Sequence, residues 1–201
     1  MHTPGFEPVP ESQQVEHKIA ASLERISQAF RVLLWEESKK FSLSPIQVQV
    51  LIFLLTHSEE KRKVSYLAAE FDMTKATISE TIKTLAQKKL ITRESEPHDT
   101  RSYVIHLTEK GTEIARSTLN FNEEIRVPVQ QLHPDDQENL LLSLLSIIRH
   151  LNRSDIITVQ RMCLTCAYYR CTSRGHYCTL LNQPLRVKDL RVDCPEHQVR
   201  T

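Results

Sequence analysis

The residues of this sequence best suited to chemistry are its five cysteines, which all lie between positions 163 and 194. Their spacing is C-x2-C-x4-C-x6-C-x15-C, and the first 162 residues contain no cysteine. Cys163 and Cys166 lie three positions apart, so their thiolates can bind one metal ion from a single turn. This clustering predicts a metal-binding tail that is chemically distinct from the rest of the chain.

Zn²⁺ usually takes four nitrogen or sulfur ligands in a tetrahedron, and the tail offers seven candidates. The four ligands that we select are Cys163, Cys166, Cys178 and Cys194, and the three alternates are Cys171, His176 and His197. Leu180 and Leu181 follow Cys178 closely and could anchor it, and Pro195 makes a rigid turn after Cys194. Cys171 lies in a polar segment, 170–175, that we expect to be a loop, so it is set aside.

Three interpretations of the cysteine tail remain open. Four thiolates close the coordination shell of zinc and leave no catalytic position, which favours a structural zinc site that folds a tail too short for a large core. Four cysteines also hold iron–sulfur clusters, which would make the protein a redox sensor. The third interpretation is a metal-free thiol switch with Cys171 as its reactive member.

The rest of the chain must position whatever the tail does, and its pattern is mostly helical. Apolar residues recur at heptad spacing over 19–33, and the whole sequence has only three glycines. Ser44-Pro45 is typical of a helix start, and the helix after it is apolar on nearly every side, as in a domain centre. The predicted helices cover 12–40, 45–56, 64–71, 75–89, 109–127 and 134–151, and the predicted strands cover 91–94 and 102–107.

Two short helices joined at Asp72-Met73 indicate a helix-turn-helix, with Thr74 as the cap of the second helix. The two strands and the polar turn between them, 96–101, predict a β-hairpin directly after it. A helix-turn-helix followed by a hairpin is a winged helix. We expect Pro128 to interrupt the helix that Thr108 caps.

Four strings in this order make the chain resemble the MarR family of bacterial transcription regulators over about residues 12–152. They are Thr77-Ile78-Ser79, Ile91-Thr92-Arg93, Asp99-Thr100-Arg101-Ser102 and Leu107-Thr108-Glu109-Lys110-Gly111. The resemblance implies an obligate homodimer on pseudo-palindromic double-stranded DNA, with the second helix of the motif in the major groove and the wing in the minor groove. It also implies a small aromatic effector, for which Trp35 and Phe30 are candidate pocket residues, although both could equally belong to the core.

The candidate DNA contacts lie on the second helix and in the wing. If Ile78, Ile82 and Leu85 face inward, short hydroxyls and lysines remain outward, where they can bind phosphates or base edges. Arg101 is the candidate for the minor groove, and Asp99 could orient it; alternatively both are a solvated turn pair. The full set is Lys75, Thr77, Ser79, Glu80, Lys83, Arg93, Asp99 and Arg101.

Bulk charge gives no support for nucleic-acid binding, because the formal net charge is +1. The sequence also lacks a Gly-rich phosphate loop and a nucleophile paired with a general base, which argues against an enzyme built on the cysteine tail. The start of the chain lacks the pattern of a signal peptide, and the longest apolar run, 50–55, is far too short to span a membrane, so we expect a cytoplasmic protein.

The sequence therefore predicts a mainly α fold made of a winged helix-turn-helix with a small β-hairpin wing, a helical dimerisation region and a small metal-bound module. The expected domains are a disordered start (1–11), a MarR-like domain (12–152) with its DNA-binding core at 44–107, and the cysteine tail (153–201). The expected function is sequence-specific transcriptional regulation by a homodimer, as a repressor rather than an activator. Its expected cofactor is zinc, with an iron–sulfur cluster as the alternative.

Overall fold

The structure, a computed structural model, describes residues 11–96, 99–173 and 175–200. Of the start that was expected to be disordered, 1–11, residues 1–10 lie outside the described residues, and Glu11 begins the first helix. The described chain is mainly helical, as expected. Its long helices are α1 (Glu11–Lys40), α2 (Pro45–Thr56), α3 (Val64–Glu70), α4 (Lys75–Gln87), α5 (Glu109–Thr118), α6 (Glu123–Gln130) and α7 (Pro134–Arg153). No helix within these ranges is both long enough and apolar enough to cross a membrane.

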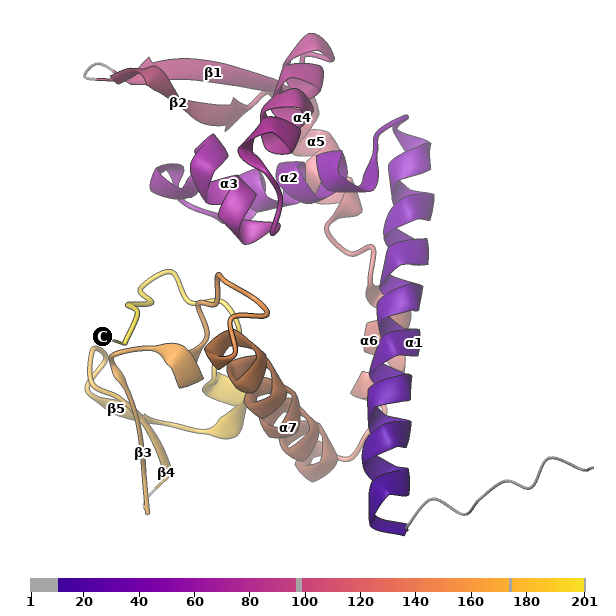
Figure 1. The fold of residues 1–201 in the computed structure, drawn as a ribbon, viewed down its shortest axis with the longest axis vertical. Helices are drawn as coiled ribbons and strands as arrows, with labels where there is room; N and C mark the ends of the chain where they lie inside the picture. Colours follow the sequence, from indigo (N-terminus) through magenta and orange to yellow (C-terminus); the bar gives the residue numbers. More distant parts are fainter. Residues whose placement is uncertain (1–10, 97–98, 174, 201) are drawn as a thin grey trace, which may run out of the picture.

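Helix α2 forms the centre of the winged domain (Figure 1). It begins with a capping box, in which the Ser44 hydroxyl accepts from the Gln47 N–H and the Gln47 side chain accepts from the Ser44 N–H. Pro45 follows at the first helical position, where its missing N–H costs nothing. Val48, Val50, Leu51, Phe53 and Leu54 are buried on several sides of this helix, as the apolar run predicted.

The predicted helix-turn-helix consists of α3 and α4. The turn between them passes through Asp72, whose φ of 49° is a left-handed conformation that Asp tolerates better than most residues. Thr74 caps α4 by accepting from the Thr77 N–H, as expected. The predicted inner face of α4 is correct, because Ile78, Ile82 and Leu85 are fully buried.

The wing is the antiparallel pair of β1 (Ile91–Glu96) and β2 (Asp99–Leu107), which projects from the domain beside α4 (Figure 1). Both strands are longer than predicted, because their backbone pairing continues into the polar segment that was expected to turn, 96–101. The register shifts between Ser95 and Glu96, which is how the pairing reaches Asp99. The tip at residues 97–98 lies outside the described part of the chain.

The prediction of one helix from 109 to about 127, interrupted at Pro128, was wrong. Helix α5 ends at Thr118, and Pro128 lies inside α6. The chain turns between these helices and places the Phe121 ring edge-on to Phe30 of α1, with centroids 6.3 Å apart. A proline in the second turn of a helix removes one hydrogen bond, and α6 continues for only two residues beyond it.

The tail forms a three-stranded antiparallel sheet in the order β3 (Tyr169–Thr172), β4 (Gly175–Cys178), β5 (Gln183–Leu185). The described residues also contain three short 3₁₀ turns. One lies between α2 and α3, η1 (Glu59–Lys61), and two lie in the tail, η2 (Cys163–Thr165) and η3 (Val187–Asp189). The expected loop at 170–175 was therefore wrong, since Cys171 lies on β3 opposite His176.

The core of the tail is shared with α7. Leu145 is a fully buried residue of that helix, and it packs in one cluster with Met162, Leu164 and Leu190 of the tail. Figure 1 shows the tail at the end of α7, below α3 and on the side of the winged domain away from the wing. The tail is thus held between α7 and the helix-turn-helix.

Candidate DNA-binding surface and cysteine cluster

The outer face of α4 carries the polar residues that the sequence singled out. Lys75, Thr77, Ser79, Glu80 and Lys83 are all exposed, opposite the buried apolar face of the same helix. Alternation of this kind on a 3.6-residue period leaves one side of the helix free to enter a groove. The structure therefore brings these five candidates together on one surface.

Two of these side chains have local partners that limit what they can do. The Thr77 hydroxyl lies 2.9 Å from the Thr74 hydroxyl, so it shares the hydrogen bonding of the helix cap. Glu80 pairs with Lys83 at 3.5 Å, with both side chains more than half exposed. An exposed pair of this kind is weak, so Lys83 can exchange it for a phosphate, and Glu80 for the amino group of a base, at little cost.

One candidate DNA contact, Arg93, lies at the base of the wing. The guanidinium of Arg93 lies 5.4 Å from the centre of the Tyr103 ring, so a cation–π contact holds it against β2. Asp99 lies on the described backbone of β2, and Arg101 follows two residues later. The side chains of Asp99 and Arg101 lie outside the described residues, so their predicted roles remain predictions.

The four selected cysteines line one cavity of about 300 Å³ in the tail: Cys163, Cys166, Cys178 and Cys194. The backbone N–H of Arg191 donates to Cys163 Sγ at 3.2 Å, as it could to a thiolate. Burial raises the pKa of the Cys163 thiol, and the charges of the other three cysteines raise it further. Leu180 and Leu181 also line the cavity, although both stay about half exposed.

The three alternates lie away from that cavity. Cys171 is exposed on β3, His176 is 2.6 Å from the Tyr169 hydroxyl, and His197 is 3.0 Å from the Thr165 hydroxyl. Among the residues that the structure describes, no three His, Cys, Asp or Glu side chains are arranged so that they could hold one ion. Zinc binding would thus require the four thiolates to draw together within their cavity, and the donor set itself, four sulfurs, suits that ion.

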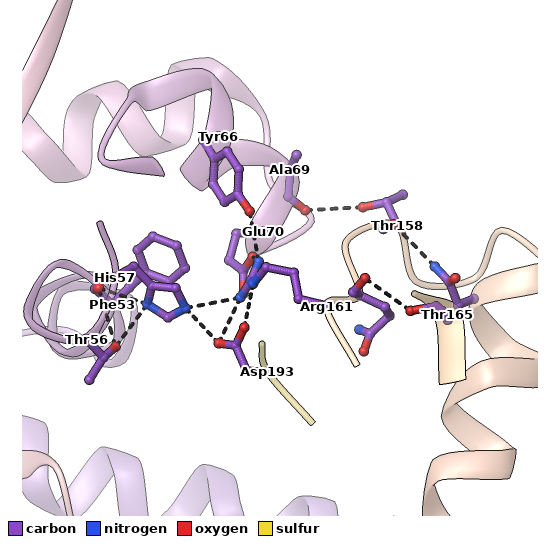
Figure 2. A network of polar contacts seen from close by, with 12 residues as sticks. Phe53, Thr56, His57, Tyr66, Ala69, Glu70, Thr158, Arg161, Thr165 and Asp193 are labelled. Atoms are coloured by element: carbon purple, nitrogen blue, oxygen red, sulfur yellow. Dashed lines mark hydrogen bonds and ion pairs between the residues drawn. The ribbon is translucent and has the colours of Figure 1, made fainter. Parts of the chain in front are cut away.

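A polar network that the sequence did not predict joins the tail to the helix-turn-helix (Figure 2). Arg161, two residues before Cys163, donates to both carboxylate oxygens of Glu70 on α3, at 2.6 and 3.1 Å. It also donates to both carboxylate oxygens of Asp193, at 2.6 and 3.1 Å, and to the Tyr66 hydroxyl at 3.0 Å. The Arg161 side chain is only 10% exposed, so these bonds replace its water.

His57 completes this network from the end of α2. Its Nε2 lies 2.7 Å from Asp193, and its ring stacks on Phe53 with centroids 3.8 Å apart. The His57 contact, followed by Arg161, holds the pKa of Asp193 well below its ordinary value. Burial disfavours the charge of Arg161, but Glu70 and Asp193 outweigh burial and raise its pKa. The network therefore stays charged and ties residues beside Cys163 and Cys194 to α2 and α3.

The apolar face of α1, which carries the heptad stripe, is largely exposed. Among its described side chains only Leu34 and Ser38 are buried, whereas Ile19 and Ile26 of the heptad stripe are 49% and 44% exposed. The two candidate effector residues lie in different surroundings. Phe30 packs on Phe121, whereas Trp35 is 51% exposed and lines a surface pocket together with Pro45. An effector at this place remains a prediction.

Known proteins resemble this chain in its winged-helix part. Residues 41–102, from the start of the winged domain into β2, match the sequence profile of the MarR family. YkoM, an uncharacterised HTH-type transcriptional regulator of Bacillus subtilis, is 27% identical over 109 residues, which cover 54% of this chain and 70% of YkoM. The chain is thus similar to MarR-family regulators over its winged-helix part.

Solved structures share the fold. The MepR–DNA complex of S. aureus is 24% identical, with a TM-score of 0.58 over 66% of this chain and 97% of MepR. AbsC, a MarR family regulator from Streptomyces coelicolor, is 22% identical, with a TM-score of 0.57 over 73% of this chain and 99% of AbsC. The proteins that the chain resembles are transcriptional regulators by name, and one of them was solved in complex with DNA.

Proposed function

We propose that the protein is a homodimeric transcriptional repressor that binds a pseudo-palindromic site in duplex DNA. The observation that carries this proposal is the exposed polar face of α4, buried on its other side and flanked by the wing. That arrangement is what a recognition helix needs, because its base-reading side chains must stand free of the core. The likeness of the fold to a MepR–DNA complex supports the same conclusion.

Fluorescence anisotropy with duplex DNA from upstream of the gene tests this proposal. Arg101→Ala should weaken binding across sequences and reduce the slope of log affinity against log salt by about one, because one groove or phosphate cation is lost. Arg116→Ala is the matched control, since Arg116 is an exposed arginine of α5 and is not among the candidate DNA contacts. Equal behaviour of the two variants would remove Arg101 from the interface, and absence of specific binding by the unaltered chain would overturn the proposal.

The homodimer rests on the uncovered apolar residues of α1 and of the helices after the wing. Besides Ile19 and Ile26, the exposed apolar side chains include Val127, Leu132 and Ile147. Exposed apolar residues in such numbers are typical of a surface that a second subunit covers. A twofold copy would also present two α4 helices to successive major grooves.

We also propose that the tail holds one structural zinc ion through Cys163, Cys166, Cys178 and Cys194. Their shared cavity supports this choice, and so does the position of Cys171 outside it. Elemental analysis should give about one zinc per chain in a colourless protein. Cys178→Ser should lose the metal, whereas the control Cys171→Ser should retain it. A brown protein with iron and acid-labile sulfide would instead establish an iron–sulfur cluster.

A further inference from the structure

A second cavity, of about 590 Å³, lies where the tail meets α7 and the helix-turn-helix. Its lining comes from Lys61 of η1, Tyr66 of α3 and Arg149 and Arg153 of α7. The tail contributes residues 158–161, 164–165, 197 and 199–200. A volume of this size is typical of pockets for small molecules. Much of its wall comes from residues after 148, beyond the segment that matches the MarR profile.

The lining of this cavity carries one sign of charge. Its described residues include five Lys or Arg and His197, and none of them is an Asp or Glu. A concave surface lined by like charges focuses a positive potential, and it raises the local concentration of anions. The cavity therefore favours an anionic occupant.

The positive charge in the cavity is only partly compensated. Arg161 is neutralised by Glu70 and Asp193, which are not among the lining residues. By contrast, the side chains of Lys61, Arg149 and Arg153 form no ion pair with any carboxylate in the described part of the chain. Lys61 and Arg149 are also half-buried, so water screens them less than it screens surface cations.

The chemistry of these cations narrows the class of ligand. The planar fork of Arg149 or Arg153 matches the two oxygens of a carboxylate or a phosphate, and Lys61 supplies a further point charge. Tyr66, Leu164 and Val199 add apolar lining between the charged groups. A ligand with a short organic body and two negative groups would satisfy both features.

We propose that this cavity binds a small organic dianion bearing carboxylate or phosphate groups. Arg149, Arg153 and Lys61 would hold the anionic groups. Tyr66, whose hydroxyl accepts from Arg161, belongs to α3, so the bound ligand would touch the helix-turn-helix as well as the tail. The site is distinct from the cysteine cavity, because the two share no lining residue.

Isothermal titration calorimetry of the full chain tests this site without DNA. The probes are sodium glutarate for the carboxylate class and sodium glycerol 3-phosphate for the phosphate class, each compared with sodium chloride at equal ionic strength. One of the two probes should bind saturably at one site per chain, and the tighter of them identifies the class. The double variant Arg149→Ala with Arg153→Ala should weaken that binding at least tenfold, and Lys61→Gln, on a different element, should also weaken it.

Arg116→Ala is the control, because it removes an exposed arginine from α5 and should leave the affinity unchanged. Absence of saturable binding for both probes, or an equal loss in the control, would overturn the proposal. If the double variant instead weakened DNA binding and left the titration unchanged, the cavity would be a DNA contact and no ligand site. Circular dichroism verifies that each variant is folded, and Lys61→Gln keeps the test decisive if the double variant is not.

Discussion

At the scale of single residues, Arg161 makes the contacts that distinguish this chain from a winged helix with a loosely attached tail. It bonds two carboxylates from distant parts of the sequence, Glu70 and Asp193, and its guanidinium lies 5.8 Å from the Phe53 ring and 5.9 Å from the Tyr66 ring. Since the side chain is almost fully covered, its loss would leave Glu70, which is 18% exposed, without its cation. Arg161 is thus the main polar attachment of the tail to α3, beside the bond from the Thr158 hydroxyl to the Ala69 carbonyl.

Arg161→Met should therefore lower the free energy of unfolding by about 2 kcal/mol, measured by urea denaturation. That figure lies below the range for breaking a fully buried pair because Asp193 is 44% exposed. Arg186→Met is the matched control in the same tail, since Arg186 and its partner Asp189 are both exposed, and it should change the free energy of unfolding much less than Arg161→Met does. Similar losses in both variants would show that the Arg161 network contributes little.

At the scale of elements, α5 docks against the turn after α4 with almost no space to spare. Thr108 caps α5, and its N–H donates to the Leu90 carbonyl at 3.0 Å. A Cβ built on Gly111 would lie 2.0 Å from the same carbonyl oxygen. The glycine in the Leu107–Gly111 string is thus required by close approach of two backbones, a physical reason for that part of the MarR-like pattern.

Gly111→Ala should destabilise the winged domain by roughly 2 to 3 kcal/mol, because the methyl group must push α5 away from the backbone of Leu90. Lys110→Ala, one residue earlier and exposed, should change stability by less than about 0.5 kcal/mol. Thermal unfolding followed by circular dichroism compares the two. A stable Gly111→Ala protein would mean that α5 can shift freely.

Elements that depend on local signals were the ones that the sequence could predict. The cap at Ser44-Pro45, the inner face of α4 and the α3–α4 turn all follow from residues close together in the chain. The break between α5 and α6 did not, because Phe121 leaves the helical path for a tertiary contact with Phe30. Pro128 was the stronger local signal, yet α6 accommodates it.

The candidate sites also fall into those that a local pattern marks and those built from residues far apart in the sequence. Periodicity placed the exposed residues of α4, and cysteine spacing selected four residues that share a cavity. The network around Arg161 joins residues up to 136 positions apart, His57 and Asp193, and neither has a neighbour in sequence that marks it. The basic cavity also escaped prediction, because its cations come from η1, α7 and the chain beyond residue 160.

At the scale of the whole molecule, the uncovered stripe of α1 runs along the long axis of the structure (Figure 1). Ile19→Glu combined with Ile26→Glu places two charges on that stripe. If it is the subunit interface, light scattering should show twice the chain mass for the unaltered protein and the single-chain mass for this variant. Burial of two unpaired carboxylates would cost the dimer several kcal/mol.

The control for that experiment is Ala21→Glu combined with Gln28→Glu, which adds the same charge to the opposite side of α1, where both residues lie away from the stripe. This variant should remain a dimer. A single-chain mass for the unaltered protein at micromolar concentration would contradict the homodimer, and with it the pseudo-palindromic site.

The cluster that α7 shares with the tail also sets an order for folding during synthesis. The winged domain is complete before Leu145 leaves the ribosome, but the residues that cover Leu145 within its own chain extend to Leu190. At about 5 to 20 residues per second, α7 would wait roughly 2 to 9 seconds for that cover. Through this interval the nascent chain would carry a finished winged-helix domain beside a helix whose apolar face lacks its final partner.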